Sequence, residues 1–175
     1  LFIPFIANCF YSIRLHPRLP RLKDIPFVKN IVVGLSWALV CTLMPLCASN
    51  LDLDSDLILS SASVIYLMLI KDFINSTLCD VKDMSGDMES GVQTIPVVLG
   101  LEKTRQILLA LNSTLLPLLI LARGKIIIIY FLLILTEYLF IIGFGESSSP
   151  AVLESFIDGE WLLTCLLLYG TGLLG

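Results

Sequence analysis

Three aspartates stand close together at the end of a long apolar stretch: Asp80, Asp83 and Asp87. In a helix with about 100° between successive residues, positions i, i+3 and i+7 fall within roughly 60° of one another. Three like charges on one helix face repel each other unless a cation lies among them. The spacing therefore indicates a site for a hard divalent cation that is shared with substrate phosphates. The alternative is a solvated acidic loop that caps a helix.

The same helix face continues backward into the apolar stretch. Ser76 and Asp72 lie four and eight residues before Asp80, so they fall on nearly the same stripe. An ionisable residue inside a membrane span is costly and normally faces a cavity or a partner. We therefore expect Asp72 to face an interior cavity, with Lys71 turned the other way. The alternative is that both side chains pair or reach toward the membrane interface.

Positive charge accompanies the aspartates. Lys82 stands between Asp80 and Asp83, and Lys103 and Arg105 come later in the same polar segment; all three are candidates for binding phosphate oxygens. Five more basic residues lie in the loop at 14–29. The chain has a single histidine and no C-x-x-C pair, so a zinc site is not expected.

The elements that must position these residues are apolar helices. Of the 175 residues, 57% are hydrophobic and 15% are charged, and the charges are bunched between long uncharged runs. This pattern is typical of a polytopic helical membrane protein, because a span of about 30 Å needs about 20 apolar residues. No basic face is free of membrane context, so nucleic acid is not expected as a partner.

We expect one membrane domain over residues 1–175, which is incomplete and begins with the tail of a helix at 1–12. About five spans follow, at 31–48, 57–79, 103–122, 126–145 and 161–175, with a tight hairpin at 122–125 and polar loops elsewhere. Loops 14–29 and 80–105 hold eight of the eleven Lys and Arg residues. By the positive-inside rule, the aspartates lie on the cytoplasmic side.

Two further acidic features lie outside this segment. Asp52, Asp54 and Asp56 fall on the opposite membrane face, where Asp56 is expected to cap the next helix. Glu137 interrupts the span at 126–145 and either lines the cavity or serves as a hydrogen-bonded structural carboxyl.

The segment from Asp80 to Gly100 resembles the second aspartate-rich motif of the UbiA family of integral membrane prenyltransferases. The matching positions are Asp80, Asp83, Asp87, Gly91, Thr94, Pro96 and Gly100. The stretch from Tyr11 to Trp37 is similar to the family's loop between its fourth and fifth helices. The family's Tyr-x-x-x-Lys element is imperfect here, because residue 15 is leucine and Arg14 comes one position early.

The resemblance implies an all-α transmembrane bundle, of which this chain is a fragment of a nine-helix fold. It implies that Mg²⁺ held by two aspartate-rich motifs binds an isoprenyl diphosphate, whose prenyl group passes to an aromatic, quinone-precursor or lipid acceptor. The implied catalytic and metal-binding residues are Asp80, Asp83 and Asp87. The implied substrate-binding residues are Lys82, Lys103, Arg105, Asp72, Ser76, Tyr11 and Arg14.

The family's first motif does not occur in residues 1–175, so the chain is expected to hold half an active site and to be inactive alone. The alternative is a non-catalytic polytopic membrane protein or transporter fragment that keeps the aspartates for cation binding. A CDP-alcohol phosphotransferase would need an Asp-Gly-x-x-Ala-Arg opening, which Val81 and Lys82 do not supply.

Overall fold

The computed structural model describes residues 25–48, 52, 54–144 and 150–170. These residues form helices joined by turns and loops, with no strand among them, which confirms the all-α prediction. The chain divides into two compact units, residues 1–101 and 102–175.

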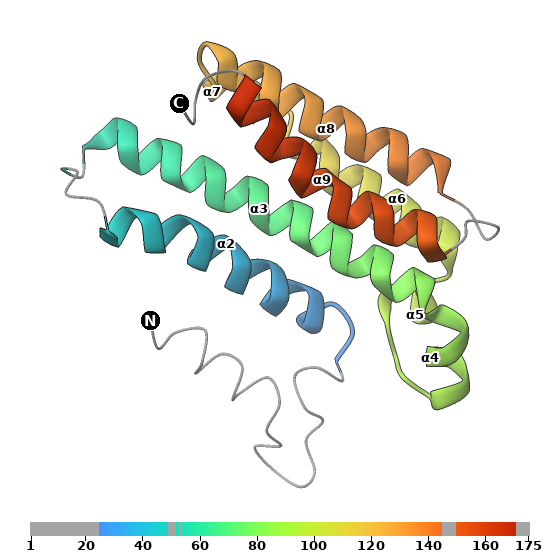
Figure 1. Ribbon diagram of the computed structural model, residues 1–175. Helices are drawn as coiled ribbons and strands as arrows, with labels where there is room; N and C mark the ends of the chain where they lie inside the picture. Colours follow the sequence, from blue (N-terminus) through green and yellow to red (C-terminus); the bar gives the residue numbers. More distant parts are fainter. Residues whose placement is uncertain (1–24, 49–51, 53, 145–149, 171–175) are drawn as a thin grey trace, which may run out of the picture. The chain divides into compact units, whose positions relative to one another are not determined.

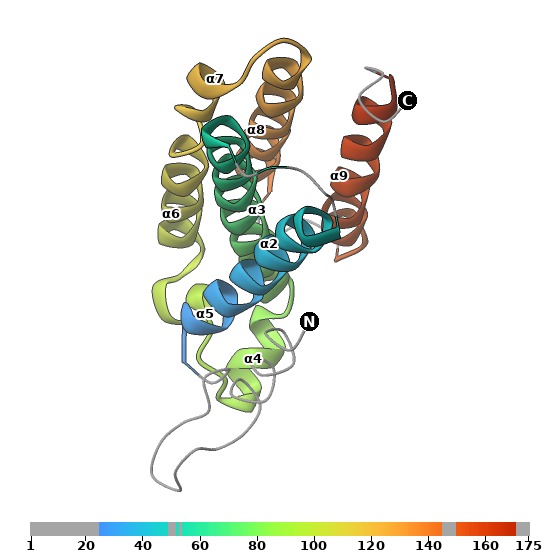
Figure 2. The same ribbon diagram turned by 90° about the vertical axis from the view of Figure 1, so that its left-hand side faces the viewer.

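In the first unit, α2 (Val28–Ala48) and α3 (Ser55–Lys82) form an antiparallel hairpin; they lie side by side in Figure 1, and α2 crosses in front of α3 in Figure 2. Asp54 is the N-cap of α3, because its carboxylate accepts a hydrogen bond from the backbone N–H of Leu57 at 2.7 Å. The prediction that Asp56 caps this helix was therefore wrong. Asp56 lies in the first turn instead, where its negative charge still interacts favourably with the helix dipole.

A stripe of small and polar side chains runs along the inner face of α2. Its buried members are spaced four residues apart: Asn30, Gly34, Ala38 and Thr42. Small side chains allow the backbones of two membrane helices to approach closely, so that van der Waals packing and interhelical hydrogen bonds hold them together. The stripe therefore determines how closely α2 can approach α3.

Two short helices follow α3: α4 (Met84–Ser90) and α5 (Ile95–Leu99), which pack against each other, and both contact α3 (Figure 1). Gly91 ends α4 in the left-handed conformation with φ of 69°, and Gly100 after α5 has φ of 78°. Pro96 stands in the first turn of α5, where its missing N–H is no loss. The spacing of these glycine and proline residues is thus a set of local folding signals that turns the chain after the aspartates.

The second unit contains α6 (Leu101–Ser113, whose first residue precedes the unit boundary), α7 (Leu118–Leu121), α8 (Lys125–Gly143) and α9 (Pro150–Gly170). The predicted hairpin at 122–125 is present, and Gly124 makes its turn with φ of 58°. The rings of Phe140 on α8 and Phe156 on α9 stack with a centroid separation of 3.6 Å.

Four stretches of the described residues are long and apolar enough to cross a membrane: Val28–Ala48, Ser55–Lys82, Leu101–Leu121 and Lys125–Gly143. Large apolar side chains on them face outward, as Trp37, Ile120 and Leu139 show. Exposed apolar surface of this extent marks contact with lipid rather than water. These stretches correspond to the first four predicted spans.

The fifth predicted span differs from the structure. Its helix, α9, begins at Pro150 rather than at residue 161, so most of the expected polar loop at 146–160 is helical. Proline is favoured at the first position of a helix, which explains the earlier start. Its first half carries three acidic residues: Glu154, Asp158 and Glu160.

Candidate functional site

Asp80, the first of the three aspartates, is buried in the last turn of α3, with 3% of its surface exposed. Its Oδ1 lies 2.5 Å from the ammonium nitrogen of Lys29, at the start of α2. Its Oδ2 accepts a hydrogen bond from Nδ2 of Asn30 at 3.1 Å. Because a buried carboxylate is stable only when it is paired and hydrogen-bonded, these two residues are what allow Asp80 to lie there.

Asn30 connects this carboxylate to the two preceding turns of α3. The same Nδ2 donates to Oγ1 of Thr77 at 2.9 Å, and the Thr77 hydroxyl donates to the carbonyl of Phe73 at 2.8 Å. Each polar group in this chain of bonds therefore has a partner, which avoids the cost of burying an unpaired donor or acceptor. Sequence reasoning did not find Lys29, Asn30 or Thr77 as site residues. The only local signal was a polar pair at the beginning of an apolar span.

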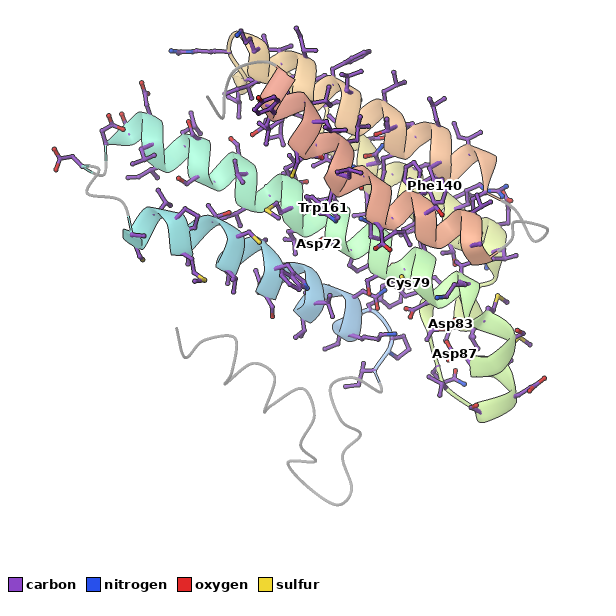
Figure 3. The ribbon with its side chains drawn as sticks, in the orientation of Figure 1. Asp72, Cys79, Asp83, Asp87, Phe140 and Trp161 are labelled. Carbon is purple, nitrogen blue, oxygen red and sulfur yellow. The ribbon has the colours of Figure 1, made fainter. Side chains whose placement is uncertain are left out.

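Asp83 and Asp87 do not continue the helix face of Asp80. The helix α3 ends at Lys82, Asp83 separates it from α4 with φ of −92° and ψ of 3°, and Asp87 lies on α4 (Figure 3). The prediction that one continuous helix aligns all three aspartates was wrong. Asp, Ser and Gly are poor interior helix residues, and the sequence after Lys82 is rich in them, so the helix is interrupted there.

The carboxylates beyond α3 are accessible. The side chain of Asp83 is 62% exposed and its Oδ1 lies 3.9 Å from Nζ of Lys82, while Asp87 is half-buried. An exposed ion pair of this kind contributes only about 0–1 kcal/mol to stability. Within the part of the chain that the structure describes, no three Asp, Glu, His or Cys residues are grouped closely enough to hold a metal ion. As oxygen donors, Asp83 and Asp87 nevertheless suit Mg²⁺, which is commonly bound through one or two carboxylates together with substrate phosphates.

The part of α3 that precedes Asp80 carries the expected polar residues, but their burial differs from the prediction. Asp72 and Ser76 are half-buried, whereas the neighbouring Lys71 is only 1% exposed (Figure 3 labels Asp72). Lys71 was expected to turn away from the interior, and that prediction was wrong. Adjacent residues on a helix differ by about 100° in direction, so hydropathy alone does not say which of the two is covered by neighbours.

The remaining candidates are placed as follows. Lys103 is exposed on α6, whereas the guanidinium of Arg105 donates a hydrogen bond to the carbonyl of Phe144 and lies 5.8 Å from the centre of its ring. Arg105 thus binds the C-terminal end of α8, where its positive charge interacts favourably with the helix dipole. Tyr11 and Arg14 lie outside the described residues.

Polar bonds also join α6 to α8. Nδ2 of Asn112 donates to the carbonyl of Ile134 at 3.1 Å, and the hydroxyls of Ser113 and Tyr138 are 2.6 Å apart. Glu137 is fully buried on α8, one turn from Ile134. Membrane helices commonly use such side-chain bonds for association, because lipid supplies no hydrophobic drive between them.

The helices, their outward apolar side chains and the polar segment after α3 define a multi-pass integral membrane protein. Residues 1–151 match the sequence model of the UbiA prenyltransferase family. The chain therefore belongs to the UbiA prenyltransferase family, and at the level of the family it is a prenyltransferase-type membrane protein. No curated protein and no solved structure matches the chain.

Proposed function

We propose that this chain carries the second aspartate-rich segment of a Mg²⁺-dependent prenyltransferase. The enzyme transfers an isoprenyl group from an isoprenyl diphosphate to a hydrophobic acceptor of the aromatic, quinone-precursor or lipid class. The observation that carries the proposal is the continuous 28-residue helix α3, which runs through an apolar span and ends where the aspartates begin. Family membership supports the same reading.

Each group then has a defined task. Asp83 and Asp87 supply accessible carboxylate oxygens toward the metal, and when bound, Mg²⁺ neutralises negative charge on the departing diphosphate. Lys82 and Lys103 are partly or fully exposed, so their ammonium groups are accessible to phosphate oxygens. The apolar helices shelter the prenyl chain and the allylic cation from water. The basic loops support a cytoplasmic location for this end of α3.

The active site needs two aspartate-rich segments, and residues 1–175 contain one. Expressed alone, this stretch is expected to bind divalent cation weakly and to show no prenyl transfer. The measurement is transfer of a labelled prenyl group from its diphosphate with Mg²⁺ in reconstituted membranes. Clear turnover by residues 1–175 would overturn the half-site proposal.

The function itself is tested in the protein isolated from its own membranes, with a panel of aromatic, quinone-precursor and lipid acceptors. Asp83→Asn should abolish transfer to the accepted substrate while the helical circular dichroism signal stays unchanged. Asp52→Asn is the matched control, because Asp52 is exposed and precedes α3 at its other end. Full activity of Asp83→Asn would remove the metal assignment. Cation binding without transfer to any acceptor would favour a non-catalytic membrane protein.

A further inference from the structure

We propose that Lys29 is a positioning residue of the acidic segment. Its ammonium group neutralises Asp80, leaves the divalent cation to Asp83 and Asp87, and presents positive charge to the diphosphate. The proposal rests on the proposed function and deepens it, because it assigns different tasks to three aspartates that the sequence treats alike.

Both carboxylate oxygens of Asp80 are engaged. Oδ1 is 2.5 Å from the Lys29 ammonium nitrogen and Oδ2 is 3.1 Å from the Asn30 amide nitrogen. A divalent cation at Oδ1 would meet an ammonium charge at the same oxygen, and two cations at so short a distance repel strongly in a buried environment. Asp80 is therefore a poor metal ligand as long as Lys29 keeps this position.

The two side chains of the Lys29–Asp80 pair differ in their exposure to solvent. The side chain of Lys29 is 35% exposed, whereas that of Asp80 is 4% exposed. A negatively charged ligand that arrives from solvent therefore meets the cationic member of the pair and not the carboxylate. A lysine ammonium offers three donors on a flexible stem, which suits a phosphate oxygen as a point charge.

The backbone turn before α2 places Lys29. Phe27, two residues earlier, has φ of 67°, a left-handed conformation that is strained for a bulky residue. This turn begins α2, because the backbone N–H of Ile31 donates to the Phe27 carbonyl at 2.9 Å. Strain of this kind persists where surrounding contacts enforce it. The turn therefore fixes the position of the first residues of α2, including Lys29, opposite the end of α3.

The proposal predicts effects of opposite sign in one variant. Lys29→Met removes the positive charge, so Asp80 becomes available and Mn²⁺, used as a paramagnetic probe, should bind about five-fold tighter. The same loss of charge should weaken pyrophosphate binding about five-fold. Lys29→Arg should keep both affinities within about two-fold, because the charge remains. A bridge that is only structural would weaken both affinities together or change neither.

Lys29→Met leaves a buried carboxylate without its ion-pair partner, which can destabilise the fold. A second variant therefore avoids this unpaired charge. The double variant Lys29→Met with Asp80→Asn removes both charges. Mn²⁺ affinity should then equal that of the unaltered protein within about two-fold, since Asp80 is not a ligand, while pyrophosphate binding stays weak. A fall in Mn²⁺ affinity in the double variant would show that Asp80 binds metal and would overturn the proposal.

The measurements are Mn²⁺ titration followed by electron paramagnetic resonance and pyrophosphate titration by calorimetry, on the protein in detergent. Lys125→Met is the control, because it makes the same charge change at the start of α8 and should leave both affinities unchanged. Equal behaviour of Lys29→Met and Lys125→Met would contradict the proposal. Neither titration uses prenyl transfer. A protein with the expected binding pattern but no prenyl transfer would contradict the proposed function without contradicting this inference.

Discussion

Gly34 of α2 lies against the backbone of α3, so that a Cβ atom on Gly34 would come within 2.9 Å of the Leu69 carbonyl oxygen. It would also lie 3.3 Å from the backbone nitrogen of Phe73. Backbone atoms of a packed helix cannot rotate away as a side chain can, so the helices themselves would have to separate. The missing side chain at position 34 therefore sets the spacing of the hairpin on which the contact between Lys29 and Asp80 depends.

Gly34→Ala should destabilise the protein by about 1–3 kcal/mol, because the added methyl group overpacks the contact between α2 and α3. The measurement is thermal unfolding in detergent. Gly159→Ala is the matched control, since Gly159 is also helical and a Cβ there would meet nothing within 4 Å. That control should be neutral or stabilising by about 0.5–1 kcal/mol. Equal unfolding temperatures for the two variants would contradict the close approach.

Asn30→Leu should lower the free energy of unfolding by about 1–3 kcal/mol, because Asp80 Oδ2 loses a buried donor. Thr42→Val, on the same face of α2, is the control. The Thr42 hydroxyl is buried and has no hydrogen-bond partner among the described residues, so its removal should be neutral or slightly stabilising. Denaturant titration of both variants in one detergent measures the difference. If Thr42→Val lowered the free energy of unfolding as much as Asn30→Leu, the result would contradict a stabilising role for the hydrogen bonds of Asn30.

Gly91→Ala should locally destabilise the turn after α4 by about 1 kcal/mol, because alanine disfavours the left-handed φ of 69°. A Cβ at Gly91 has open space, so the cost is conformational and not steric. Hydrogen–deuterium exchange of residues 84–95 should therefore become faster. Gly86→Ala, inside the same short helix and also without a nearby atom, should slow it. Faster exchange in both variants would show that the turn geometry is not the cause.

Arg105→Gln should destabilise the protein by about 1–3 kcal/mol, because the Phe144 carbonyl loses a charged donor and its ring loses a cationic neighbour. Lys103→Gln should leave stability unchanged, since Lys103 is exposed, and should instead raise the KM for the prenyl diphosphate. Unfolding curves and steady-state kinetics on the two variants separate the roles. A raised KM with unchanged stability in Arg105→Gln would return Arg105 to the substrate site.

Features that depend on local composition were predictable. Runs of about 20 apolar residues must be helical in lipid, whatever packs beside them, and this is why the span that ends before Asp80 was found. The motif after it was also readable, because Gly91 and Pro96 act through their own backbone preferences. The break at Asp83 was not predictable from the charge spacing, because i, i+3 and i+7 positions fit one helix only if the poor helix formers after Lys82 do not interrupt it.

The sequence by itself determined the spans, the turns and the segment that carries the carboxylates, since each follows from residues within one or two helical turns. Only the tertiary structure decided which carboxylate is already neutralised. Lys29 is 51 residues from Asp80, and their contact exists because α3 runs back along α2 and packs closely against it at Gly34. It likewise decided that Lys71 is buried more completely than Asp72. Charge pairing and burial depend on what lies across a helix contact, and no local pattern contains that information.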